Sequence, residues 1–140
     1  MALLPVAEAL ARILSGTKLT AAEDVALARA IGRVLAAPLK SKRDQPPFDA
    51  SAMDGYAVIA SDGPELTLIG ISAAGHRYRG TVKRREAVRI FTGAPLPKGA
   101  DAVIIQENVE AKDGAIVCRE PVRVGQNLRP RGLDFAKGAE

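Results

Sequence analysis

Aromatic residues, cysteine and histidine are all scarce in this sequence. Its 140 residues include no tryptophan, one cysteine and one histidine, and aromatics make up 4% of the chain. His76 has no second His or Cys at metal-ligand spacing, so we expect neither a zinc site nor a Ser-His-Asp arrangement. Cys118 follows Ile116 and Val117 and is expected in the core. A lone cysteine forms no internal disulfide, which favours a reducing compartment.

The sequence also lacks a long unbroken hydrophobic run and a strong excess of one charge. Glu8 and Arg12 interrupt the apolar N-terminal residues, and no basic leader precedes them, so we expect neither a signal peptide nor a membrane span. The net charge of +4 favours an anionic ligand only weakly. The densest basic run, Lys83–Arg85, lacks interleaved aromatics and is interpreted as a solvated turn. We therefore expect a cytoplasmic protein without a membrane or nucleic-acid partner.

Hydrophobic residues make up 47% of the chain, enough for a core built from Ala, Val, Leu and Ile. The first segment predicts an amphipathic helix that ends at Gly16, and its apolar face holds Leu3, Ala7, Leu10 and Leu14. Thr20–Glu23 has the pattern of a capping box and predicts a second helix, which a left-handed Gly32 would end.

The composition changes at Lys40, and we place a domain junction over Lys40–Pro47, where a proline pair forbids helix and central strand. Beyond it, short strand-like runs alternate with Gly and Pro, and they predict a compact, partly closed β-barrel. The expected strands cover residues 56–59, 66–71, 87–91, 102–105 and 115–119. The fold class is therefore α+β, with N-terminal helices and a β-rich module.

Two segments concentrate residues that suit chemistry. In Pro46–Tyr56, Asp49 and Asp54 flank Ser51 within a stiff loop that can hold a carboxylate in place. On local chemistry alone, ordinary turn and capping chemistry is the favoured explanation of the same residues.

The second segment is Phe91–Asp101, where a strand ends at Thr92 and Gly93 permits close backbone approach. A hydroxyl and free amides there suit an oxyanion or phosphate, although the segment is not a Walker loop and can equally be a proline-stiffened loop without a ligand. Arg129 and Arg131 are either phosphate ligands or partners of Asp134.

Four motifs occur in an order and spacing that one family shares. They are Asp49–Val58, Phe91–Pro97, Ala102–Glu107 and Gly125–Gly132. Together they resemble the N-terminal half of the molybdopterin molybdenumtransferases, the family of the bacterial MoeA proteins and the E domain of gephyrin. The resemblance covers nearly the whole chain.

The resemblance implies two domains. Residues 1–44 and 121–140 would belong to a helical and extended dimerisation domain, domain I. Residues 45–120 would form the β-rich, barrel-like domain II inserted into it. The family's C-terminal pterin-binding domains are absent from this chain, so we expect a homodimerising N-terminal portion of a longer enzyme, inactive alone. The alternative is a stand-alone dimerisation or binding module without catalysis.

The resemblance also implies a reaction and a site. The family inserts molybdate into adenylylated molybdopterin with displacement of AMP, and it needs magnesium or a similar cation, held mainly by the missing domains. Asp54 and Thr92 match the family's functional aspartate and threonine. Ser51, Asp49 and Gly93 match neighbouring positions expected at the cofactor, and no metal ligand set is expected within this chain. Leu133 departs from the family's usual acidic residue but leaves Asp134.

Overall fold

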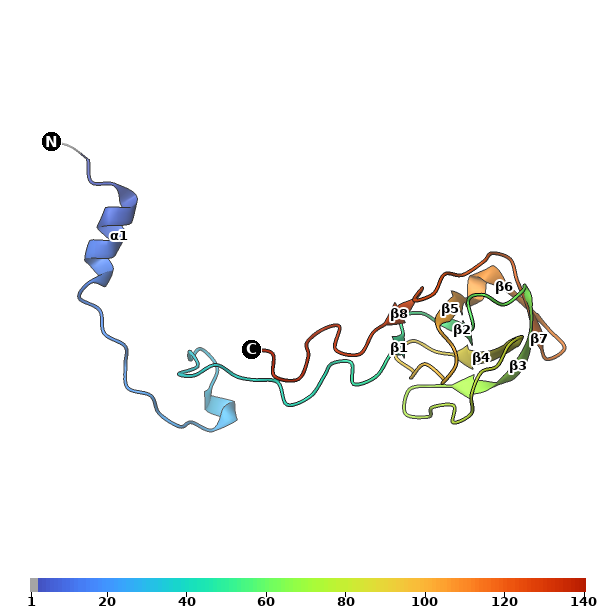
Figure 1. Ribbon diagram of the computed structural model, residues 1–140. Coiled ribbons are helices and arrows are strands. Elements are labelled where there is room, and N and C mark those ends of the chain that lie inside the picture. Colours follow the sequence, from blue (N-terminus) through green and yellow to red (C-terminus); the bar gives the residue numbers. More distant parts are fainter. Residues whose placement is uncertain (1–2) are drawn as a thin grey trace. The chain divides into compact units, whose positions relative to one another are not determined.

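The computed structural model describes residues 3–140, and the chain divides into two compact units at Leu39 and Lys40. The first unit contains α1 (Val6–Leu14) and a 3₁₀ turn, η1 (Leu27–Arg29). The second contains the strands, labelled in Figure 1. They are β1 (Ala50–Ser51), β2 (Gly55–Val58), β3 (Glu65–Ser72), β4 (Glu86–Ile90), β5 (Ala102–Ile105), β6 (Val109–Lys112), β7 (Ala115–Cys118) and β8 (Leu128–Arg129), with the 3₁₀ turn η2 (Gln106–Asn108) between β5 and β6.

The first predicted helix is confirmed as α1, whose register allows Glu8 and Arg12 to form an exposed ion pair four residues apart. None of its residues is buried. No helix among residues 3–140 is long and apolar enough to cross a bilayer.

The second predicted helix is wrong. Its expected range contains only the η1 turn, although Gly32 has the left-handed φ of +79° that we expected. The carboxylate of Glu23 pairs with Arg33 instead of capping the first turn at Thr20. A short segment without packing against another element does not hold a helix by propensity alone.

Six strands form one mixed sheet in the order β5-β2-β4-β3-β7-β6. All five predicted strands are confirmed within one or two residues, whereas β6 and the two short strands β1 and β8 were not predicted. The edge strands β5 and β6 are consecutive in the chain, with only η2 between them. Four residue steps span less than about 15 Å, so the sheet must curl until its two edges lie near each other. The predicted barrel-like module is therefore a strongly curled, open sheet, which we call the β module (residues 50–118).

Apolar side chains cover both faces of the β module. One cluster collects residues from five strands inside the curl, namely Tyr56, Val58, Leu66, Ala87, Ala102, Ile104 and Ile116. The other lies on the opposite face, where loop residues cover strand residues: Ala57, Val82, Val88, Ile90, Ala94 and Val103. Full burial of one Val, Leu or Ile side chain contributes about 1.5–3 kcal/mol, so these clusters give the module its own core.

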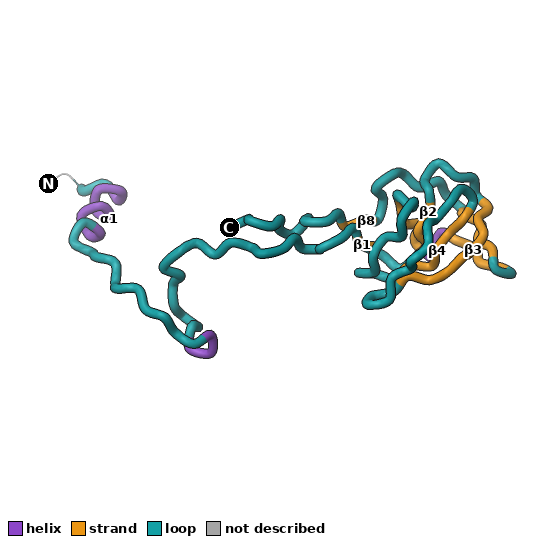
Figure 2. Tube along the Cα trace, turned by 60° about the horizontal axis from the view of Figure 1, so that its bottom comes forward, coloured by secondary structure: helices purple, strands orange, loops and turns teal. Residues whose placement is uncertain are grey.

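Two segments from opposite ends of the second unit pair as a ribbon, which we define as residues 41–51 with residues 127–139. β1 pairs antiparallel with β8, and farther along Gln45 bridges Phe135. Backbone bonds continue to the end of the ribbon, where the Ser41 amide donates to Ala139 at 2.8 Å. Figures 1 and 2 show the two segments side by side as they leave the β module. The assignment of residues 1–44 and 121–140 to one dimerisation domain stays a prediction.

Candidate active site

The two candidate segments of the sequence are joined backbone to backbone at one end of the β module. Ser51 donates its amide to the Ala94 carbonyl at 3.0 Å and accepts the Gly93 amide at 2.9 Å. The Ser51 side chain is fully buried, and its hydroxyl donates to the Met53 carbonyl at 2.6 Å. The loop before β2 is therefore locked against the loop after β4.

Gly55 explains why β2 can begin directly after Asp54. A Cβ atom at this position would lie 1.9 Å from the carbonyl oxygen of Ile104 in β5, a contact that no side chain tolerates. The glycine lets β2 approach β5 closely, and Asp54 stays at the strand end, half-exposed.

Asp54 and Thr92 form a hydrogen-bonded pair at this end. Asp54 Oδ1 accepts the Thr92 amide at 2.8 Å and the Thr92 hydroxyl at 2.7 Å. Those two bonds, backbone first, hold the pKa of the Asp54 carboxyl below its ordinary value. Desolvation opposes them less strongly, and the positive charge of Arg89 adds a still smaller lowering of the pKa. Within residues 3–140, Asp54 Oδ2 accepts no hydrogen bond.

Arg89, which the sequence analysis did not single out, lies beside this pair. Its guanidinium carbon is 5.1 Å from the ring centroid of Tyr56 and 4.8 Å from that of Phe91. One nitrogen, Nη1, donates to the Gly55 carbonyl at 3.0 Å, and Nη2 donates to Gln106 Oε1 at 2.5 Å. The signal that could have found it is a single charge within the apolar run Ala87–Phe91, shortly before Thr92.

A family model described as the MoeA N-terminal region, domains I and II, matches residues 4–140. The chain belongs to this family. The molybdopterin molybdenumtransferase of Haemophilus influenzae is 42% identical over 123 residues, which cover 85% of this chain and 30% of that protein. The protein of that name from Staphylococcus aureus is 32% identical over 143 residues, covering 96% of this chain and 34% of its own length.

Solved structures agree with the family. A crystal structure of a molybdopterin biosynthesis MoeA protein from Pyrococcus horikoshii superimposes with a TM-score of 0.78 at 40% identity, over 84% of this chain and 33% of that one. A second from the same organism gives 0.75 at 34% identity, over 98% of this chain. The chain spans about a third of the length of the relatives it matches.

The amides of the MoeA-type loop after β4 are not free, which corrects one expectation from the sequence. The Thr92 amide is bonded to Asp54, the Gly93 amide to Ser51, and the Ala94 amide to the Phe91 carbonyl at 2.9 Å. Gly93 has a φ of +79°, so it makes the turn that aims the Thr92 and Gly93 amides back into the protein. An anion at this loop would have to displace one of these bonds.

Of the other predicted site residues, one lies in the core and one in the ribbon. The buried hydroxyl of Ser51 would have to leave its partners to touch a cofactor. Asp49 is exposed, and its Oδ1 accepts the Arg131 amide at 2.8 Å across the ribbon.

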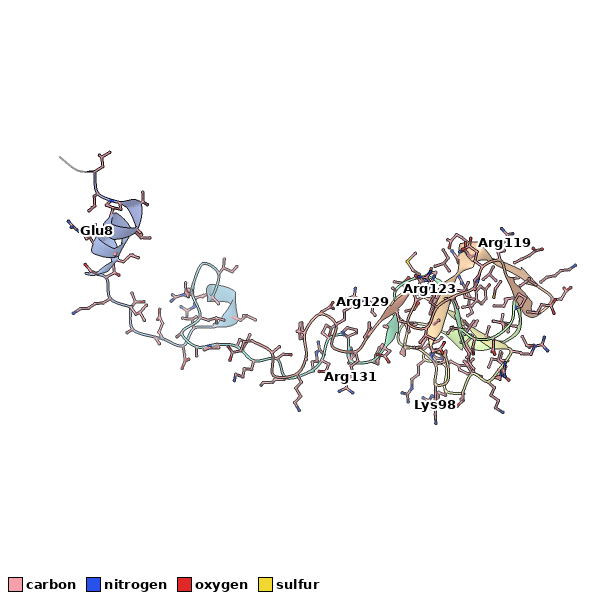
Figure 3. All side chains as sticks on the ribbon, turned by 45° about the horizontal axis from the view of Figure 1, so that its top comes forward. Glu8, Lys98, Arg119, Arg123, Arg129 and Arg131 are labelled. Carbon is pink, nitrogen blue, oxygen red and sulfur yellow. The ribbon has the colours of Figure 1, made fainter. Side chains whose placement is uncertain are left out.

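The two ribbon arginines, labelled in Figure 3, pair with carboxylates. Arg129 reaches Asp134 at 2.5 Å, and Arg131 reaches Asp44 at 2.6 Å. The predicted ion pair with Asp134 is therefore confirmed for Arg129, whereas Arg131 pairs with Asp44 and not with Asp134.

The Asp54–Thr92 pair lies on an open surface. Two hollows in the second unit are lined by other residues, one around Pro64 and Cys118 and the other around Phe48 and His76. Neither is lined by Asp54 or Thr92. Thr92 is exposed and Asp54 half-exposed, so the pair is accessible at the surface of the second unit.

Proposed function

We propose that this chain is the N-terminal portion of a molybdopterin molybdenumtransferase and supplies one wall of its active site through Asp54 and Thr92. The observation that carries the proposal is their direct bonding across two family motifs that lie 38 positions apart in the chain. A structural support role alone does not require the pair to stand at an open strand end with one carboxylate oxygen unoccupied.

In this proposal Asp54 is the ligand-facing group and Thr92 orients it. The Thr92 hydroxyl donates to Oδ1, so the free Oδ2 faces the site as an ionised acceptor. The lowered pKa keeps that carboxylate charged at neutral pH. Oδ2 is then available to position a cation or a donor group of the pterin substrate in the whole enzyme.

This chain's residues would hold magnesium only together with ligands from the substrate. No group of three or more His, Cys, Asp or Glu side chains gathers around a metal position in residues 3–140. Protein Mg²⁺ sites commonly use one or two carboxylates together with substrate phosphates. Asp54 would hold the ion with the phosphates of adenylylated molybdopterin, and the bound ion would neutralise charge as AMP leaves.

We also propose that the chain works as a homodimer in the cytoplasm and is inactive alone. Apolar side chains such as Leu10 and Ile13 of α1 stand exposed, at 54% and 71%, and offer a face for a second copy. We expect the chain alone to be inactive because it would supply only one wall of the site. The opposite wall and most of the pterin contacts would come from the part of the longer relatives that this chain does not span.

The test joins residues 1–140 to the remaining part of the Haemophilus influenzae relative and measures molybdenum cofactor formed from adenylylated molybdopterin and molybdate. The fusion should be active and the isolated chain inactive. Asp54→Asn should lower the rate roughly 100-fold or more, and Thr92→Val less, because Thr92 acts through Asp54.

Asp113→Asn is the matched control, since Asp113 is exposed in the left-handed turn between β6 and β7 and Asn tolerates that conformation. Full activity of the Asp54→Asn fusion would remove Asp54 from the mechanism. Activity in the isolated chain would contradict its proposed dependence on the missing domains. An inactive fusion beside an isolated chain that dimerises would favour the stand-alone module.

A further inference from the structure

The Arg89 side chain makes four contacts within the second unit. In the antiparallel pairing of β2 with β4 it lies opposite Tyr56, and its guanidinium lies over that ring and over Phe91. Its two terminal nitrogens donate to Gly55 and Gln106. Two aromatic faces and two hydrogen bonds leave this half-buried side chain one orientation.

The contacts of Arg89 fall on the chain neighbours of the Asp54–Thr92 pair. Gly55 directly follows Asp54, and Arg89 binds its carbonyl. Phe91 directly precedes Thr92, and Arg89 stacks on its ring. Arg89 therefore ties together the two backbone segments that carry the pair, without bonding to Asp54 itself.

We propose that Arg89 is the positioning residue of this site: by holding Gly55 and Phe91, its guanidinium fixes the geometry in which Asp54 accepts both donors of Thr92. The proposal rests on the proposed function for its consequence in catalysis. Its structural part concerns this chain alone. The positive charge also favours the ionised form of Asp54, so position and charge act in the same direction.

The geometry calls for arginine and not for any cation. A planar guanidinium stacks on two rings while its separate nitrogens reach two acceptors, whereas a lysine ammonium is a point charge on a flexible stem. Arg89→Lys therefore keeps the positive charge but removes the ring stacking and the paired hydrogen bonds. A purely electrostatic role would survive this substitution, and a positioning role would not.

The experiment compares Arg89→Lys with Arg119→Lys in the isolated chain by NMR. Arg119 is an exposed arginine directly after β7, the last strand of the β module, and is labelled in Figure 3. In the Arg89 variant the Thr92 amide should lose its Asp54-bonded chemical shift and exchange with solvent about tenfold faster or more. Amides of the β2–β5 ladder should stay unchanged, and Arg119→Lys should leave Thr92 as it is.

A second variant keeps the test decisive if Arg89→Lys disturbs the fold. Phe91→Leu removes one stacking face at a side chain that is 37% exposed, and it should loosen Thr92 in the same direction with a smaller change. An unaltered Thr92 amide in a folded Arg89→Lys chain overturns the proposal. If Arg89→Lys does not fold, an unaltered Thr92 amide in Phe91→Leu does so.

Activity measured in the fusion with the Haemophilus influenzae relative tests the role of Arg89 separately from the proposed function. Arg89→Lys should lower kcat about tenfold or more with little change in KM, because the ground-state contacts of the substrate are retained. If Thr92 is loosened but neither Arg89→Lys nor Asp54→Asn affects activity, the proposed function fails and the positioning stands. If Asp54→Asn abolishes activity while Arg89→Lys changes neither Thr92 nor kcat, the positioning fails and the proposed function stands.

Discussion

Both units of the chain carry many apolar side chains. Those of the first unit are exposed, whereas the second unit buries a core of them. Ile31 in the first unit is 93% exposed, whereas Ile90 in β4 is fully buried. Residues 3–39 contain no buried side chain, but the second unit covers both faces of its sheet with its own loops. An amphipathic pattern therefore states which face of an element is apolar, and another part of the chain must supply the cover.

The candidate site residues all lie in one of the two units. The Asp54–Thr92 pair, Arg89 and the buried Ser51 all lie in the self-covered unit, where packing fixes their positions. The exposed apolar residues of the first unit suit an interface with other protein. In the proposed function the second unit would supply the site residues and the first unit would supply the dimer interface.

The largest effect should come from truncating the same residue type in the two units. Ile90→Ala should lower the free energy of unfolding by about 2–5 kcal/mol, because it leaves a cavity beneath Val88 and Val103. Ile31→Ala should change it by less than about 0.5 kcal/mol. Urea unfolding followed by circular dichroism measures both values. Equal losses would mean that the first unit is packed as tightly as the second.

Much of the β module was predictable because its strands alternate with Gly and Pro at short intervals. β6 (Val109–Lys112) was missed because it is only four residues long, carries two charges and is mostly exposed, so its short alternation is a weak signal. The left-handed pair Asp113-Gly114 was the available signal, since it makes the tight hairpin with β7. The second helix was expected wrongly because a capping pattern says nothing about whether a packing partner exists.

The site was predictable in its residues but not in its bonds. Asp54 and Thr92 were both identified, one from each motif, yet no local pattern states that they touch across 38 positions. The expectation of free amides after Thr92 failed because the acceptors, Asp54 and Ser51, come from the other segment. Arg89 shows the same limit, since its importance depends on the strand pairing that brings Tyr56 and Gly55 beside it.

A smaller and local effect is expected from acid. The Lys137 amide and the Arg131 side chain, in that order, lower the pKa of Asp44 in the ribbon, against smaller desolvation. A carboxyl with a lowered folded-state pKa stabilises the fold above its unfolded pKa of about 4 and loses that contribution as the pH falls through the folded value. The protection of ribbon amides such as Lys137 and Ser41, measured relative to the intrinsic exchange rate at each pH, should therefore fall in acid before that of the β4 amides does.

Hydrogen exchange between about pH 6 and pH 2.5 measures this difference between the ribbon and the β module. Asp44→Asn provides the control, because it loosens the ribbon already at neutral pH and should remove most of the acid dependence of the Lys137 amide. Asp24→Asn, in the first unit, should change neither. Ribbon amides whose protection, relative to the intrinsic exchange rate, does not change with pH would contradict the role given to Asp44.

The smallest change in the free energy of unfolding should follow removal of the whole first unit. Removal of residues 1–39 takes away α1 and the exposed apolar side chains of the first unit but none of the buried core of the second unit, so the free energy of unfolding should stay within about 0.5 kcal/mol. The Thr92 amide should keep its Asp54-bonded shift in the shortened chain. Sedimentation should nevertheless show the loss of the proposed dimer, since the face that a second copy would cover is gone. A large loss of stability at concentrations where the full chain is monomeric would show that the first unit packs on the second within one chain, and the contrast between the two units would then no longer hold.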